Sequence, residues 1–146
     1  KVLAYNRSEK AFDGVTFVSL DTLLKNSDIV TVHCPLNAQS NEMFNKATFD
    51  KMKDGAFFVN TARGGVMVEQ DLIDALNSGK LGGAGVDVLS TEPMSKGSKL
   101  PNTKNLLITP HIAWAPIETR ERLIDIVYDN IDCFVKGTPK NVVNNP

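Results

Sequence analysis

Three short apolar runs of the chain each lead into charged or titratable residues, and this repeated pattern most constrains the fold. The runs and the groups that follow them are residues 55–60 before Arg63, residues 83–86 before Asp87 and Glu92, and residues 106–109 before His111. Short β-rich runs separated by helical stretches are typical of a parallel sheet, which binds ligands outside the carboxyl ends of its strands. We therefore expect a guanidinium, carboxylates and an imidazole to meet at one sheet edge, as in a catalytic site.

Strand-like and helix-like stretches alternate along the chain, which predicts an α/β fold with a doubly wound parallel sheet and right-handed crossovers. The expected strands are residues 1–5, 28–33, 56–60, 81–88 and 105–109. The expected helices are residues 19–26, 46–53, 68–78 and 116–135, with boundary signals at Ser19, Gly55, Gly79 and Pro116. The polar segment 90–105 is expected to be a surface loop, and the tail 136–146 is expected to leave the domain.

The composition narrows the class of function. A net charge of −1 gives no reason to expect a nucleic acid or an anionic membrane as a partner, and no apolar stretch approaches the length of a membrane span. The cysteines Cys34 and Cys133 and the histidines His33 and His111 lack the spacing of a metal site. We therefore expect a cytoplasmic protein with reduced thiols and without a metal.

His111 is the first candidate for chemistry. Pro110 favours an extended backbone at Thr109, so we expect the strand to end there with the imidazole at the sheet edge. A carboxylate from Glu92, on a neighbouring strand-end loop, could bond one ring nitrogen, which would fix the tautomer and favour the protonated ring. Taken singly, a structural histidine and a solvated loop carboxylate are the simpler interpretations.

Arg63 and Asp87 extend the candidate site. Gly64 and Gly65 follow Arg63 and would permit a tight turn whose backbone is exposed to a ligand, while the guanidinium fork suits bidentate capture of a carboxylate. Asp87 could accept a hydrogen bond from a ligand amide or ribose. The alternatives are a surface arginine and a helix or turn cap. The shared position at strand ends is what favours a common site.

The segments that carry these residues resemble the signature segments of the D-isomer-specific 2-hydroxyacid dehydrogenases. They are residues 60–65, residues 85–88 with 92–93, and residues 109–114, and residues 33–36 also fit the family pattern. The resemblance covers nearly the whole chain in the right order. Trp114 and the tail segment 139–144 look closest to the glycerate dehydrogenase (hydroxypyruvate reductase) branch.

The resemblance implies an oxidoreductase that transfers a hydride between NAD or NADP and a small 2-keto or D-2-hydroxy acid, with hydroxypyruvate or glycerate as the first expectation. Arg63 would bind the substrate carboxylate, His111 would protonate the keto oxygen, and Glu92 would orient His111. Asp87 would bind the nicotinamide carboxamide. The residues implied to contact the cofactor are Asn6, Arg7, His33, Cys34, Pro35, Thr61, Ala62, Arg63, Asp87, His111 and Ala113. A homodimer is also implied.

The chain departs from the family pattern at its N-terminus. The Gly-x-Gly-x-x-Gly turn is absent, and residues 2–5 look like the strand after that turn, so we expect a Rossmann-like fold that lacks its first strand. On this view residues 1–135 form the dinucleotide-binding domain and residues 136–146 lead back towards a substrate domain. A sheet without its central strand also leaves open an inert fragment of a dehydrogenase.

Cofactor choice and the class of function stay open at this level. An acidic residue normally ends the second strand and binds the ribose hydroxyls, but Asn6 and Arg7 follow Tyr5 here. Arg7 could pair with the 2′-phosphate of NADPH, or it could point to solvent while NADH binds. Transcriptional corepressors resemble the same family, so a nucleotide-sensing module is an alternative that binds the cofactor without turnover.

Overall fold

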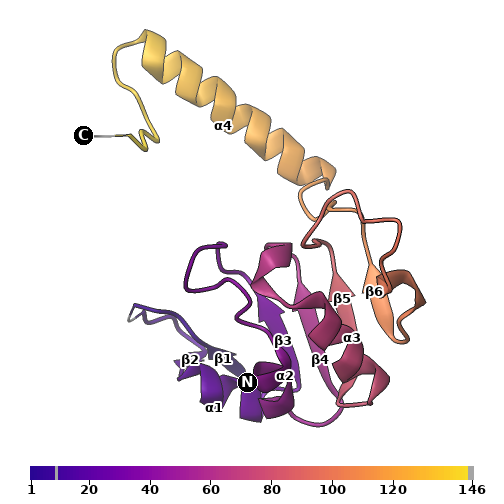
Figure 1. Ribbon diagram of the computed structural model, residues 1–146. Coiled ribbons are helices and arrows are strands. Elements are labelled where there is room, and N and C mark those ends of the chain that lie inside the picture. The colour runs from indigo at the N-terminus through magenta and orange to yellow at the C-terminus, as the bar shows by residue number, and fades with distance from the viewer. Residues whose placement is uncertain (9, 145–146) are drawn as a thin grey trace. The chain divides into compact units, whose positions relative to one another are not determined.

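Six strands form two parallel sheets in the computed structural model, which describes residues 1–8 and 10–144. One sheet pairs β1 (Val2–Ala4) with β2 (Val15–Phe17). The other has the order β3-β4-β5-β6, formed by β3 (Ile29–Val32), β4 (Ala56–Asn60), β5 (Leu81–Val86) and β6 (Leu106–Ile108). These four strands lie side by side in Figure 1. The Rossmann-like α/β class is confirmed, whereas a further strand before residue 1 stays a prediction.

The helices are α1 (Leu20–Asn26), α2 (Lys46–Lys51), α3 (Glu69–Asn77) and α4 (Ile117–Val135), with short 3₁₀ turns η1 (Gly64–Val66) and η2 (Leu100–Asn102). Ser19 caps α1 as predicted, because its side chain accepts the Thr22 N–H at 3.2 Å. Gly55 and Gly79 follow α2 and α3 with φ angles of 77° and 81°, a left-handed backbone that glycine adopts at little cost.

Element ends differ from the sequence-based expectations by up to two residues, as at Lys51 of α2 and Val86 of β5, and three further features also differ. β2 was not expected, because three residues are too few to show a strand period. Pro116 is the N-cap of α4 rather than a residue of its first turn. The segment 90–105 is not wholly a surface loop, because η2 buries Leu100 and the following Thr103 is also buried.

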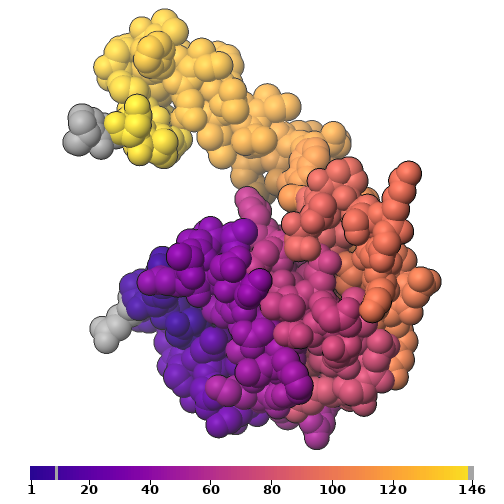
Figure 2. All heavy atoms as spheres, viewed as in Figure 1, coloured from indigo at the N-terminus to yellow at the C-terminus, as the bar shows by residue number. Residues whose placement is uncertain are grey.

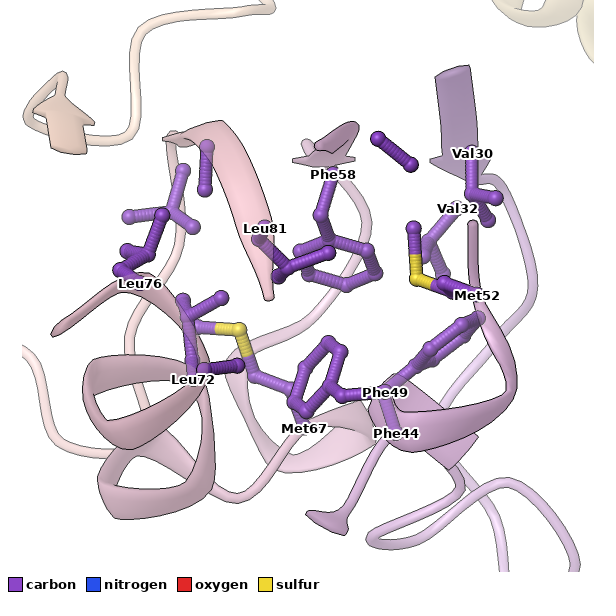
Figure 3. Packing of buried hydrophobic residues seen from close by; sticks show 14 of the residues in the cluster. Val30, Val32, Phe44, Phe49, Met52, Phe58, Met67, Leu72, Leu76 and Leu81 are labelled. Carbon is purple, nitrogen blue, oxygen red and sulfur yellow. The ribbon is translucent and has the colours of Figure 1, made fainter. Parts of the chain in front are cut away.

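The core lies on one face of the four-stranded sheet. Val30 and Val32 of β3 and Phe58 of β4 are buried there. The ring centroid of Phe58 lies 4.9 Å from that of Phe44 and 5.2 Å from that of Phe49, and the rings are tilted or edge-to-face as aromatic pairs prefer. Figure 3 shows this cluster beneath the sheet. This core cluster packs against the strands whose carboxyl ends carry the candidate residues.

Helices α1, α2 and α3 contribute side chains to the same core cluster. Consistent with this, Ile29, Phe57 and Leu107, which belong to β3, β4 and β6, remain 64%, 51% and 68% exposed. The described helices α1, α2 and α3 therefore leave the other face of the four-stranded sheet uncovered.

The chain divides into two units, residues 1–111 and 112–146. The first carries both sheets, and its spheres run from indigo to orange in Figure 2. The second contains α4, which ends before Gly137 with φ 76°, and its described tail, residues 136–144, has neither helix nor strand. Residues 145–146 of the expected tail lie outside the described residues. Whether the dinucleotide-binding domain extends to residue 135 stays a prediction. Among the described helices, none is both long enough and apolar enough to cross a bilayer.

Candidate active site

The three strands that precede the candidate residues end at the same level of the sheet. Asn60 of β4 pairs with Val86 of β5, and Val86 pairs with Ile108 of β6. Beyond these pairs the ladder continues, because the Asp87 N–H donates to Asn60 O and the Thr109 N–H donates to Val86 O. The segments that follow β4, β5 and β6 therefore leave the sheet at one edge, as the sequence predicts.

Glu92 and His111 form a direct pair at this edge. His111 Nδ1 lies 2.7 Å from Glu92 Oε2, and the Leu89 N–H donates to Glu92 Oε1 at 2.8 Å. Both side chains remain accessible, with 45% of His111 and 36% of Glu92 exposed. The hydrogen bond to His111, followed by the Leu89 N–H, lowers the pKa of the Glu92 carboxyl below its ordinary value. The geometry thus holds an ionised carboxylate against the Nδ1 side of the imidazole.

The backbone presents His111 in an uncommon conformation. Its φ of 56° is left-handed, and its N–H donates to Thr109 O at 3.0 Å. The Thr109 hydroxyl donates in turn to Asp87 Oδ1. Asp87 is buried, so its carboxylate helps to fix the turn that delivers the imidazole. The expected contact of Asp87 with a nicotinamide carboxamide stays a prediction.

Asn60 shapes the turn that carries Arg63. Its fully buried side chain accepts the Ala62 N–H and donates to Arg63 O, both at 3.0 Å. The Arg63 guanidinium donates from Nη1 to the Ala62 carbonyl at 2.6 Å. Asn60 belongs to one of the signature segments, but the sequence alone predicts no role for its side chain. A polar residue at the end of a buried strand was the available signal.

Gly64 does not expose its backbone to a ligand, contrary to the expectation. It is buried, and a Cβ added there would lie 1.9 Å from the carbonyl carbon and oxygen of Leu89. Glycine is needed because the loop after β5 passes directly against this turn. At Gly65 the nearest atoms belong to the Leu36 side chain, 2.9 Å from an added Cβ. The turn that carries Arg63 and the loop that carries Glu92 therefore lie in contact.

A cavity of about 850 Å³ lies between β1 and β3, and residues of both strands line it together with the segments that follow them. Five of the residues expected to contact the cofactor line it: Asn6, Arg7, His33, Cys34 and Pro35. Lys10 adds a second cation, and the Arg7 Nη1 donates to Gln39 Oε1. The two cations, Arg7 and Lys10, could pair with a phosphate group of a ligand, whereas the strand residues make much of the remaining lining apolar.

The remaining predicted residues lie elsewhere. Thr61, Ala62, Arg63, Asp87 and His111 belong to the strand ends described above, in the first unit with the cavity. Ala113 belongs to the second unit, so its contact with a cofactor stays a prediction. Within residues 1–8 and 10–144, no cluster of three or more His, Cys, Asp or Glu side chains is placed to hold a metal ion.

These features define a class of protein, a Rossmann-like α/β fold with an imidazole–carboxylate pair at its sheet edge. The family described as D-isomer specific 2-hydroxyacid dehydrogenase, NAD binding domain, matches residues 1–113, and the chain belongs to it. The chain is 49% identical over 147 residues to a hydroxypyruvate reductase of Blautia hydrogenotrophica, covering 99% of this chain and 46% of the relative. It is 42% identical over 145 residues to a glycerate dehydrogenase of Methylorubrum extorquens, covering 98% and 45%.

Solved structures agree with this assignment. An NADPH-dependent glyoxylate/hydroxypyruvate reductase from Sinorhizobium meliloti, in complex with NADP and sulfate, superposes with a TM-score of 0.85 at 33% identity, covering 99% of this chain and 48% of that one. An acyclic imino acid reductase in complex with NADPH and D-Arg gives a TM-score of 0.90 at 31% identity, covering 98% and 46%. The chain thus spans just under half the length of each of these four proteins.

Proposed function

We propose that the whole protein reduces a small 2-keto acid to its D-2-hydroxy acid with NADH or NADPH, and that hydroxypyruvate is its first substrate. The observation that carries this proposal is the 2.7 Å pair of His111 and Glu92 at the sheet edge that also carries the Arg63 turn. Hydroxypyruvate reductase and glycerate dehydrogenase among the relatives support the choice of substrate.

Each residue has a distinct part in the proposed reaction. Arg63 binds the substrate carboxylate, because its fork offers two parallel donors to two oxygens. Glu92 holds the Nδ1 side of His111, so we assign proton donation to Nε2, directed at the keto oxygen. The bound nicotinamide supplies the hydride. The Glu92 carboxylate at Nδ1 holds the ring in one orientation while the proton leaves Nε2.

The decisive test replaces His111 in the whole protein. His111→Asn is expected to lower kcat for hydroxypyruvate reduction about 10²–10⁴-fold, the usual contribution of a positioned acid. The dissociation constants of NADH and NADPH, measured by fluorescence titration, should remain unchanged. Retained turnover in His111→Asn would contradict the mechanism. Cofactor binding without turnover in the wild-type whole protein would favour the nucleotide sensor instead. The inert-fragment alternative is tested on the 146-residue chain alone, and it is favoured if that chain neither binds the cofactor nor turns over substrate.

Arg7 favours NADPH over NADH in this proposal. Asn6 and Arg7, rather than an acidic residue, come directly after Tyr5, and Arg7 and Lys10 both line the cavity. Arg7→Ala should raise KM for NADPH about tenfold and leave KM for NADH unchanged, since the lost ion pair involves the 2′-phosphate alone. Lys80→Ala is a matched control, because Lys80 precedes β5 at the opposite end of the sheet. Equal effects of Arg7→Ala on both cofactors would exclude this preference.

A homodimer, a cytoplasmic location and the absence of nucleic-acid and membrane partners remain proposals. A mass measurement in solution on the whole protein, by light scattering, tests the first of them directly.

A further inference from the structure

Glu69 is hydrogen-bonded to the loop that carries Glu92, although Glu69 has no part in the proposed reaction. Its Oε1 accepts two hydrogen bonds from Ser90, from the N–H at 2.7 Å and from the hydroxyl at 2.8 Å. Ser90 stands two residues before Glu92, and Glu69 lies 21 residues earlier in the chain. One carboxylate oxygen therefore fixes both the backbone and the side chain of the residue at the base of this loop. Such charge-assisted bonds are stronger than neutral ones.

The element that carries Glu69 is firmly held. Leu72 and Leu76, two of the core residues of α3, are fully buried. The segment just before the helix is tied to the core as well, because the Val68 N–H donates to Phe44 O at 2.8 Å. Glu69 therefore connects the loop to a helix that is packed against the core.

Two further hydrogen bonds connect the loop to the imidazole of His111. Ser90 is adjacent to Leu89, whose N–H donates to Glu92 Oε1, and Glu92 Oε2 meets His111 Nδ1. On its other side, the Leu89 carbonyl rests against Gly64. The loop is thus held by α3 at Ser90 and by the Arg63 turn at Leu89, which leaves Glu92 little freedom to move away from His111.

We propose that Glu69 is a positioning residue for the Glu92–His111 pair, acting through its two hydrogen bonds to Ser90. Without these bonds the loop shifts, Glu92 loses its alignment with His111 Nδ1, and the imidazole samples other tautomers. The expected effect on turnover rests on the proposed function, whereas the expected effect on the imidazole does not.

Nitrogen NMR of the imidazoles tests this proposal without any activity assay. The chain has two histidines, so long-range ¹H–¹⁵N spectra report His111 together with His33 as an internal reference. In Glu69→Ala, the His111 ring nitrogens should shift towards the values of an unconstrained imidazole while those of His33 stay in place. Glu69→Gln, whose amide oxygen can still accept from Ser90, should restore most of the wild-type spectrum. Gln70→Ala, in the same helical turn, is the matched control and should change nothing.

Unchanged His111 signals in folded Glu69→Ala would overturn the proposal. If that variant does not fold, Ser90→Ala decides, because it removes one of the two bonds and keeps the Ser90 backbone donor. An intermediate shift of His111 in Ser90→Ala supports the positioning role, and no shift excludes it.

Kinetics provide the second readout. Glu69→Ala should lower kcat about 10- to 100-fold, the scale of an ångström-level misplacement, and leave KM for the cofactor unchanged. A wild-type protein without turnover would refute the proposed function, whereas the His111 spectra would still decide the role of Glu69. Wild-type turnover with full activity in Glu69→Ala would refute the positioning role alone.

Discussion

Replacing Gly64 by alanine should separate two loops that the fold requires to touch. The added Cβ would lie 1.9 Å from the carbonyl carbon and oxygen of Leu89 and 2.5 Å from the amide nitrogen of Ser90. An ordinary contact needs 3.4 Å, so the two backbones would have to move apart by about 1.5 Å. Because neither partner is a flexible side chain, we expect a cost at the upper end of overpacking, about 3 kcal/mol of the free energy of unfolding.

Urea denaturation followed by circular dichroism measures this cost. With an m-value of about 2 kcal/mol/M, the midpoint of Gly64→Ala should fall by about 1.5 M. Two other glycines calibrate the result. In Gly65→Ala the new methyl meets side-chain atoms alone, Leu36 at 2.9 Å and Asn41 Oδ1 at 3.7 Å, so we expect a loss of about 1 kcal/mol. In Gly85→Ala no atom lies within 4 Å, and stability should change by about 0.5 kcal/mol or less. Equal midpoints for Gly64→Ala and Gly85→Ala would refute the reasoning.

Three further changes test other parts of the structure. Asn60→Ala should cost about 1–3 kcal/mol in urea denaturation, because the turn formed by residues 61–63 loses its buried hydrogen-bond partner. The contact with His111 lowers the pKa of Glu92 in the folded protein below its ordinary value of 4.5. The stability that the pair contributes is therefore fully present above pH 4.5, and it is lost as the pH falls through the pKa of Glu92 in the folded protein. A carboxyl ¹³C titration should show this inflection below 4.5, and His111→Asn should move it upward. Ser19→Ala should cost about 1 kcal/mol by thermal unfolding, since it removes a helix cap, and an unchanged melting temperature would contradict the cap.

The parts of the fold that follow local rules were predictable from the sequence. Ser19 is an ordinary N-cap, and β4 ends at Asn60, where its apolar run meets polar residues as predicted. β5 and β6 end at Val86 and Ile108, within two residues of their expected ends. The meeting of Glu92 with His111 followed from the same rule, because parallel strands bring their carboxyl ends to one edge. These inferences needed no knowledge of distant contacts.

Contacts between distant segments were not predictable in the same way. Glu69 reads locally as an acidic residue in the first turn of a helix, a position that the helix dipole already favours. Nothing near it in the sequence indicates that its partner is Ser90. Gly64 likewise signals a close approach, but the pattern cannot say whether a ligand or another loop approaches, and the structure shows Leu89.

The left-handed backbone at His111 bears on how mutant libraries at this position should be interpreted. A backbone φ of 56° is sterically unfavourable for most side chains, whatever their chemistry. Asparagine and aspartate tolerate this region better than β-branched residues do. Inactivity of His111→Val would therefore mix the loss of the imidazole with a distorted turn. His111→Asn keeps the turn and isolates the loss of the ring, so a ranking of substitutions by residual rate at position 111 needs a parallel ranking by stability.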